Sequence, residues 1–223
     1  MFKVITASVR GSPFVGVYCL ATDTYCLIPN HIESKVETEI QETLNVKTIR
    51  TTILESNLIG SLCCGNSTKL AVPVELEKKE LSLLEKELPN VEILKLKGNF
   101  ALGNLVALND SKMILSEMLP EKIKNDIINF FGLDAKEMSI QGNPLMGSLI
   151  KLTNKGFLVG TLINKAEFAE LKEFTGLNGM VGTCNYGDRF IGNDLIANSN
   201  GLAAGFITSG FELGRIDEAL SGR

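Results

Sequence analysis

The chain has 223 residues, of which 44% are hydrophobic and 22% charged, and its formal net charge at pH 7 is −4. This composition is ordinary for a globular protein. A negatively charged protein gains little from counterion release on a nucleic-acid backbone, so nucleic-acid binding is not expected as the main activity. A basic protein, or a mixed protein–RNA surface, fits the charge better as a partner.

Cysteine usage and hydropathy indicate the cellular setting. The five cysteines, an odd number, do not suggest a disulfide framework. The N-terminal residues MFKVITASVR lack the long apolar stretch of a secretory signal, and no apolar run approaches the ~18 residues that span a bilayer. We therefore expect a cytoplasmic protein with reduced thiols and without membrane contact.

One sequence pattern recurs five times along the chain. Each copy has two apolar residues, a glycine, a short apolar run, a polar turn and a second apolar run. The copies cover residues 14–29, 58–73, 100–115, 145–160 and 190–205. Their shared glycines are Gly16, Gly60, Gly103, Gly147 and Gly192, with successive spacings of 44, 43, 44 and 45 residues. Such regular self-similarity indicates a repeat architecture.

Each copy predicts a β-hairpin followed by an amphipathic helix. The turns consist of Asn, Asp, Ser, Thr and Gly, which favour tight turns. Apolar residues at helical spacing then predict helices over 30–45, 74–88, 120–131, 164–175 and 208–220. In the last of these, Phe211, Ile216 and Leu220 are candidates for the buried face.

A further strand is expected after four of the helices, at 46–53, 91–97, 135–140 and 179–184. The fifth helix has no such successor, and residues 2–9 are expected to supply the missing strand to the last repeat. Pairing the two chain ends closes the ring and removes an open sheet edge.

The predicted fold is therefore α/β, a closed five-bladed β/α propeller with pseudo-fivefold symmetry. We expect a single domain over residues 1–223. Its repeats cover approximately 14–56, 57–99, 100–143, 144–188, and 189–223 with strand 2–9. The recurring glycines have two structural interpretations: close approach of strands near the axis, or a bend that requires positive φ.

Few residues carry recognisable chemistry. The adjacent Cys63 and Cys64 correspond to Val106–Ala107 and Ile150–Lys151 in other copies, which indicates packing rather than a redox or metal site. His31 is the one histidine, no metal-ligand spacing is present, and no cofactor is expected. The charge-rich run 75–80 is interpreted as the solvated face of a helix. The five polar turns predict a broad, flat surface suited to docking.

Several segments resemble the translation initiation factor 6 family of archaea and eukaryotes. They are TYCLIP (24–29), CCGNSTKLAVP (63–73), ALGNLVALND (101–110) and GTCNYGDRFIGNDLIAN (182–198). The resemblance covers essentially the whole chain, and the short C-terminus is similar to archaeal members. It implies the pentein-type fold and a protein without catalytic activity.

The same resemblance implies binding to the large ribosomal subunit on its intersubunit face, which prevents association with the small subunit and accompanies subunit maturation. The implied contacts are a uL14-type ribosomal protein and the sarcin–ricin loop region of the rRNA, reached by a monomer. Positions that match the family's docking residues are Ser61, Asn66, Asn104, Leu149 and Asn193. Ser61 and Leu149 depart from the larger polar or aromatic groups of eukaryotic members.

Two other functions are considered. Some penteins are enzymes that modify guanidino groups with a nucleophilic cysteine, a histidine and carboxylates; here Cys184 and His31 would be the candidates. His31 falls at a helix start rather than at an axial strand end, which disfavours this alternative. A self-associating scaffold is the third hypothesis.

Overall fold

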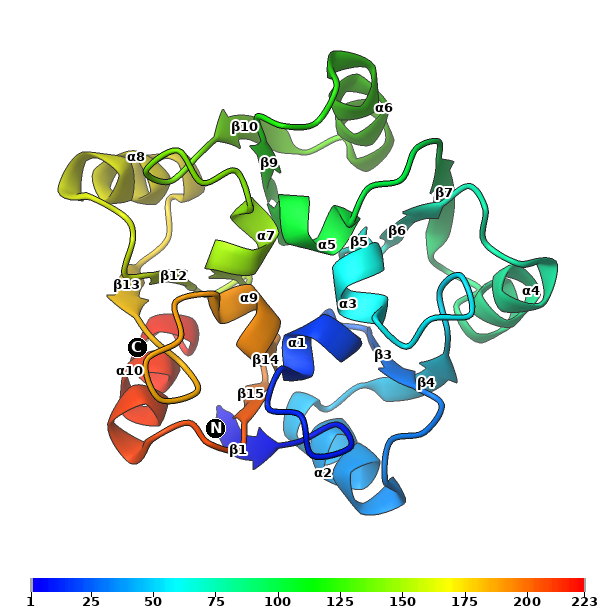
Figure 1. The fold of residues 1–223 in the computed structure, drawn as a ribbon, viewed down its shortest axis with the longest axis horizontal. Helices are drawn as coiled ribbons and strands as arrows, with labels where there is room; N and C mark the ends of the chain where they lie inside the picture. Colours follow the sequence, from blue (N-terminus) through cyan, green and yellow to red (C-terminus); the bar gives the residue numbers. More distant parts are fainter. Residues whose placement is uncertain (1, 223) are drawn as a thin grey trace.

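The structure, a computed structural model, describes residues 2–222. Five small sheets surround a common axis (Figure 1). Their inner strands are β2 (Leu20–Ala21), β5 (Cys64–Gly65), β8 (Val106–Leu108), β11 (Ile150–Leu152) and β14 (Leu195–Ala197). The middle strands are β3 (Tyr25–Pro29), β6 (Lys69–Pro73), β9 (Lys112–Ser116), β12 (Phe157–Gly160) and β15 (Gly201–Gly205).

The outer strands are β4 (Lys47–Thr51), β7 (Glu92–Leu96), β10 (Asp134–Met138), β13 (Gly179–Gly182) and β1 (Lys3–Ala7). Inner and middle strands form antiparallel hairpins, and each outer strand pairs parallel to its middle strand. In the last sheet the outer strand is β1, which pairs with β15 from Lys3↔Gly201 to Ala7↔Gly205. The expectation that the chain's first strand completes the fifth repeat is confirmed.

Five peripheral helices confirm the helical predictions. They are α2 (Ser34–Leu44), α4 (Lys78–Glu87), α6 (Glu121–Phe131), α8 (Lys165–Thr175) and α10 (Gly210–Leu220). In α10, Ile216 and Leu220 are buried as expected, but Phe211 is 81% exposed, so its assignment to the buried face was wrong. Phe211 lies in the first turn of α10, where its side chain does not reach the sheet.

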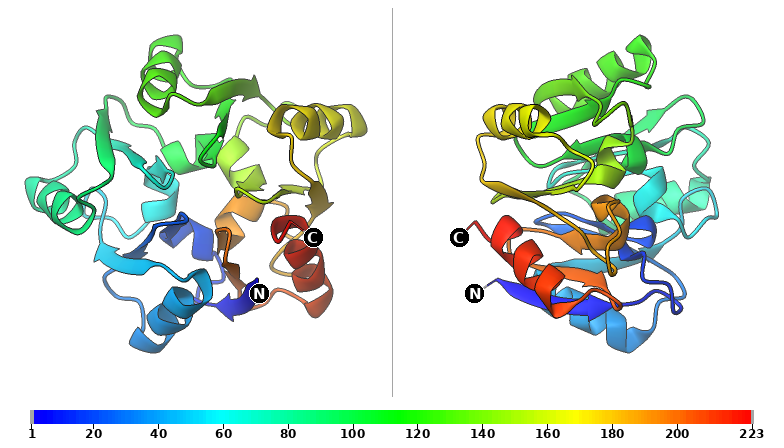
Figure 2. Two further views of the ribbon diagram at one scale, coloured as in Figure 1. Left: turned by 180° about the vertical axis from the view of Figure 1, so that it is seen from behind. Right: turned by 60° about the vertical axis from the view of Figure 1, so that its left-hand side comes forward.

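Each peripheral helix fills the wedge between two neighbouring sheets (Figure 2). Ile40 of α2 belongs to one core together with Ile28 of β3 and Ala203 of β15. The preceding residue of β3, Leu27, belongs to the adjacent core with Leu84 of α4. Because both faces of a middle strand are covered, these strands are nearly continuous apolar runs. The burial of both faces ties successive repeats into one packed ring.

The recurring glycines lie in five short helices rather than in strands. These helices are α1 (Val15–Tyr18), α3 (Ile59–Leu62), α5 (Leu102–Leu105), α7 (Met146–Leu149) and α9 (Ile191–Asp194), and they surround the axis (Figure 1). The predicted hairpins therefore begin only after these helical turns. The hairpin prediction was wrong at this point because apolar residues followed by glycine are equally compatible with one helical turn.

Backbone crowding explains why glycine is required in each short helix. A Cβ built on Gly103 would lie 1.8 Å from the carbonyl oxygen of Gly60, and one on Gly60 would lie 2.0 Å from that of Gly16. The same contact, at 1.8–2.0 Å, links Gly16 to Gly192, Gly192 to Gly147 and Gly147 to Gly103. None of the five has positive φ. Close approach at the axis is confirmed, and the bend interpretation is wrong. We call these five residues the glycine ring.

Replacing Gly103 with alanine is expected to lower the free energy of unfolding by about 3 kcal/mol or more, because the new Cβ must displace backbone atoms of Gly60 and Cys63 in the preceding repeat. Urea unfolding followed by circular dichroism measures the change. Gly214→Ala is the matched control: this exposed helical glycine has nothing within 4 Å of its ideal Cβ. The control should gain about 0.5–1 kcal/mol. Equal effects of the two substitutions would contradict the crowding explanation.

Candidate functional site

Three of the predicted site residues meet at one end of the axis. Ser61, Asn104 and Asn193 each follow the ring glycine and occupy the third position of α3, α5 and α9. We call this end, formed by the five short helices, the short-helix face; it points toward the viewer in Figure 1. All three side chains are half-buried and have no hydrogen-bond partner among residues 2–222. Their polar groups are available to a partner.

The other two predicted residues lie elsewhere. Leu149 is the last residue of α7 and only 1% exposed, packed in the core that contains Phe157. Asn66 lies in the hairpin turn after β5, at the other end of the inner strand, and is 5% exposed. Its Oδ1 accepts hydrogen bonds from the backbone N–H groups of Thr68 (3.1 Å) and Lys69 (2.9 Å). Neither side chain joins the short-helix face.

The five hairpin turns at that opposite end are bonded to one another. Thr24 Oγ1 donates to Ser67 O (2.8 Å), Ser67 Oγ to Asp110 Oδ2 (2.8 Å), the Asp110 N–H to Asn154 Oδ1 (3.0 Å), Lys155 Nζ to Ser199 O (2.6 Å) and Ser199 Oγ to Asp23 Oδ2 (2.6 Å). The turns were expected to edge a docking surface. These hydrogen bonds instead use much of their polar capacity to close the ring, so we call this set the turn ring.

Three glutamates that the sequence reading missed hold the loops around the short-helix face. Glu80 accepts from the backbone N–H groups of Leu54 (3.1 Å) and Glu55 (2.8 Å), two residues with positive φ. Glu167 does the same for Gln141, and Glu212 for Gly187 (2.8 Å). Glu80 is 3% exposed, so the interpretation of its charge run as wholly solvated was wrong.

The signal for these glutamates was present in the sequence. Each occupies the third position of its helix, where its carboxylate also accepts from the N-cap backbone N–H in a capping box. The spacing Asn164–Glu167 and Ser209–Glu212 predicts the cap. It does not predict the loop contact, because the loop precedes the helix by more than twenty residues.

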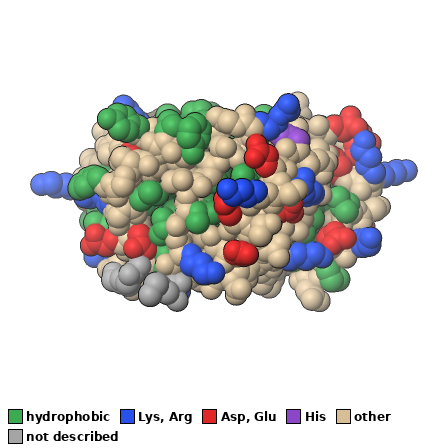
Figure 3. Space-filling view, turned by 90° about the horizontal axis from the view of Figure 1, so that it is seen from below, with side chains coloured by type: hydrophobic (Ala, Val, Ile, Leu, Met, Phe, Trp, Pro, Cys, Tyr) green, Lys and Arg blue, Asp and Glu red, His purple; other side chains and the backbone are tan. Residues whose placement is uncertain are grey.

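Exposed apolar side chains gather where the last repeat meets the first. They are Phe14, Tyr186, Phe206, Ile207 and Phe211, and Tyr186 is 83% exposed. The loops that carry Phe14 and Tyr186 are joined by the hydrogen bond from Asn185 Nδ2 to Pro13 O (3.0 Å). Glu212, the residue after Phe211, accepts from the Tyr186 N–H. We call them the seam patch. Figure 3 shows hydrophobic side chains gathered at the upper left of the face drawn. Exposed apolar patches often mark interaction sites.

A buried carboxylate lies beneath this seam. Asp194 of α9 is fully buried; its Oδ1 accepts from Asn185 Nδ2 (2.8 Å), and its Oδ2 has no partner among residues 2–222. The pKa of Asp194 is raised to about 7, mainly by burial and also by the carboxylates of Asp188 and Glu212, against the lowering effect of the Asn185 hydrogen bond. Asp194 is thus a carboxyl group that the fold favours in its protonated form.

The cysteines are packing residues in this structure. Burial raises the pKa of Cys64 to about 12 and that of Cys63 well above its usual value, with Cys64 adding to the latter shift. Burial also raises the pKa of Cys184 to about 12, and its Sγ lies 3.2 Å from Thr208 Oγ1. A neutral, buried thiol is a poor nucleophile. His31 lies in the turn before α2. These positions give the guanidino-enzyme alternative no support.

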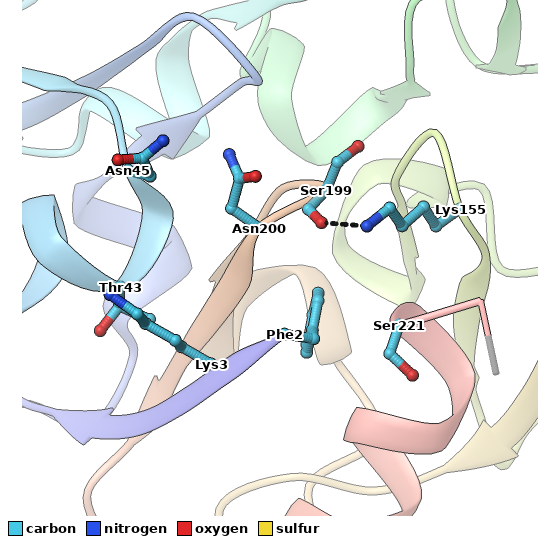
Figure 4. A pocket seen from close by; sticks show the side chains of 8 residues that line it. All are labelled: Phe2, Lys3, Thr43, Asn45, Lys155, Ser199, Asn200 and Ser221. Atoms are coloured by element: carbon cyan, nitrogen blue, oxygen red, sulfur yellow. Dashed lines mark hydrogen bonds between the residues drawn. The ribbon is translucent and has the colours of Figure 1, made fainter.

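A large hollow of about 550 Å³ lies on the opposite side of the seam from the patch. Figure 4 shows the side chains that line it. Both of its lysines are engaged with the backbone: Lys3 Nζ donates to Glu42 O (2.7 Å) and Lys155 Nζ to Ser199 O (2.6 Å). The hollow therefore adds no free cation to the site.

Within residues 2–222, no helix has the length and apolarity to cross a membrane.

The pH dependence of folding is expected to contain a contribution from Asp194. The pKa of Asp194 is higher in the folded than in the unfolded protein. Its contribution to the free energy of unfolding is therefore fully present below about pH 4 and is lost as the pH rises toward 7, at about 1.4 kcal/mol per pH unit. Asp194→Asn should remove this slope. Urea unfolding of both proteins from pH 4 to 8 measures it, with the exposed Asp126→Asn as control. Parallel profiles for wild type and Asp194→Asn would contradict the assignment.

Comparison with known proteins places the chain in a family. The model of the eIF-6 family matches residues 4–219. Curated relatives include translation initiation factor 6 of Pyrococcus horikoshii, 33% identical over 95% of this chain and 95% of the relative. The proteins of the same name from Methanocaldococcus jannaschii and Methanococcus vannielii are each 34% identical, over 99% and 97% of this chain and 99% and 98% of the relative. The chain therefore belongs to the eIF-6 family.

Proposed function

We propose that this protein is a translation initiation factor that binds the large ribosomal subunit on its intersubunit face and prevents association with the small subunit. Membership of the eIF-6 family over residues 4–219 supports a role in translation rather than in catalysis. The structural observation that carries the docking site is the set of unpartnered polar side chains at Ser61, Asn104 and Asn193. They occupy equivalent places around the axis on a single face.

The short-helix face has the anatomy of an interface. Protein interfaces use both hydrogen-bonding polar groups and apolar, often aromatic, side chains. The three polar residues lie near the axis, and the seam patch supplies large apolar side chains at the edge, including Phe14 and Tyr186. Glu80, Glu167 and Glu212 hold the surrounding loops, so little ordering should be required on binding. Such a preorganised face suits a large partner with a defined shape.

The net charge favours a protein component in the contact. At −4, the chain has no general attraction for rRNA, so the rRNA contact should be local. A uL14-type ribosomal protein is the proposed main contact, with the sarcin–ricin loop region of the rRNA beside it. We place the docking residues at Ser61, Asn104 and Asn193. The buried Leu149 would support this face from its core, whereas Asn66 orders a hairpin turn at the opposite end of the ring.

The proposed mechanism is steric. A rigid ring of 24.2 kDa seated on the intersubunit face occupies the space that the small subunit needs. Large subunits stay free of small subunits when the factor binds the large subunit more tightly, or is present at a higher concentration, than the small subunit. The protein would act as a monomer in the cytoplasm. Because no bond is made or broken, its removal from the large subunit requires a separate release activity.

Asn104→Arg is expected to weaken binding to the large subunit about tenfold or more, equivalent to ~1.4 kcal/mol, because a long cation replaces a short amide at the contact. Co-sedimentation with purified large subunits, small subunits and joined ribosomes measures it. The wild type should bind only free large subunits and reduce the yield of joined ribosomes at fixed magnesium.

The control is Asn125→Arg, which adds the same charge on the exposed side of α6. It should bind like the wild type, and both variants should keep the wild-type thermal transition. Equal binding of the wild type to both subunits, or to neither, would refute the function. A loss of folding in Asn104→Arg would assign Asn104 a structural role instead.

A further inference from the structure

Two small cavities are stacked on the axis of the ring. The first, of about 60 Å³, extends from the glycine ring to a layer formed by Ala21, Gly65, Leu108, Leu152 and Ala197. The second cavity, of about 30 Å³, extends from this layer to the residues of the turn ring, including Asp23 and Asp110. The axis therefore contains unfilled space from the glycine ring to the turn ring.

One repeat breaks the symmetry of the first cavity. Lys151 of β11 stands at the position that Leu20, Cys64, Ala107 and Ile196 occupy in the other repeats. Its neighbours Ile150 and Leu152 also line the cavity but belong to a hydrophobic core, whereas Lys151 lines the cavity and belongs to no core. Among residues 2–222, Lys151 is the one charged side chain in that lining. A lysine here does not fit the packing role that the repeat pattern assigns to this position.

The Lys151 ammonium has no counter-charge. Within residues 2–222, its Nζ has no hydrogen-bond or ion-pair partner. Burial lowers the pKa of Lys151 to about 8, so the ammonium remains the main form at pH 7. Its titratable neighbour is Cys26, whose pKa burial raises to about 12, so that thiol is neutral. Lys151 is half-buried. A charge held inside a protein without a partner is costly, and such charges are normally paired.

Protein carboxylates do not supply the missing charge. Asp23 and Asp110 line only the second cavity, and their oxygens already accept hydrogen bonds from Ser199, Ser67 and Asn154. The backbone offers further donors, because each inner strand pairs on one side only and keeps a free edge of N–H and C=O groups. An ammonium together with N–H donors forms a site for an anion.

The cavity limits the size of the ligand. One water-sized particle needs ~10–15 Å³ of cavity space, so 60 Å³ holds a few particles of that size. A halide ion with one or two waters fits, whereas an organic phosphate does not. We propose that the axial cavity binds a halide-sized inorganic anion, of which chloride is the type, on the ammonium of Lys151.

Such an anion would supply the counter-charge that Lys151 of the fourth repeat lacks inside the ring. It would bind the folded ring and not the unfolded chain, and its stabilisation of the fold would therefore grow with the logarithm of its concentration once that concentration exceeds Kd. The proposal concerns the interior of the ring and does not depend on the ribosome-binding function.

Bromide is the probe for the location of the site, because it replaces chloride and scatters anomalously. Crystals of the full chain are soaked in bromide, and others are grown from protein refolded in bromide, so that the ion can reach an interior site by either route. The expected result is an anomalous peak in the cavity beside Lys151 Nζ. Bromide peaks on the outer surface alone would mean an adventitious ion only, and this result would overturn the proposal.

Thermal unfolding tests whether chloride stabilises the fold through Lys151. The midpoint is compared in chloride and in gluconate at equal ionic strength and with the same cation. The wild type and the surface control Lys172→Met should show a rise specific to chloride, and Lys151→Met should lose it. Lys151→Met should fold, because apolar residues occupy this position in the other repeats.

Lys151→Arg should retain the chloride effect, because it keeps the charge. Retention of the full effect in Lys151→Met, or its absence in the wild type, would refute the site. If Lys151→Met does not fold, the bromide experiment on the wild type and the Lys151→Arg measurement decide the question.

Discussion

The approach of five glycine backbones at the axis is the contact on which the rest of the structure depends. Each ring glycine lies against the carbonyl of the previous one, at a distance that no side chain tolerates. This contact sets how closely the short helices meet, and therefore the angle between successive sheets. The wedge that remains between two sheets is filled by a peripheral helix such as α2, which buries Ile40 against both neighbours. Packing density then makes the ring rigid.

The two ends of the ring differ because their polar groups have different partners. At the turn ring, Asp23, Asp110 and Asn154 bond to neighbouring turns and lock the repeats together. At the short-helix face, Asn104 and Asn193 keep their hydrogen-bonding capacity because the helical turn already satisfies the nearby backbone. A rigid body with one self-satisfied end and one receptive end is suited to block a surface, and that is the function proposed for this member of the eIF-6 family.

Departures from fivefold symmetry concentrate at the seam and on the axis. The seam joins the two ends of the chain through β1 and β15, and it carries both the exposed Tyr186 and the buried Asp194 beneath it. On the axis, Lys151 replaces an apolar residue. A perfectly repeated ring would offer five equal surfaces and an uncharged interior. The positions at which the repeats differ are therefore the ones that can distinguish a partner or a ligand.

The sequence alone determined the repeats, the peripheral helices, the outer strands and the closure by residues 2–9, because these follow from local apolar periodicity and from one missing strand. It also led to the family. Only the tertiary structure decided which side chains share a face: Ser61, Asn104 and Asn193 meet, while Leu149 and Asn66 are buried. It likewise revealed that Glu80 is buried against a loop and that Phe211 is exposed. Periodicity describes one repeat at a time, whereas these outcomes depend on contacts between segments that are distant along the chain.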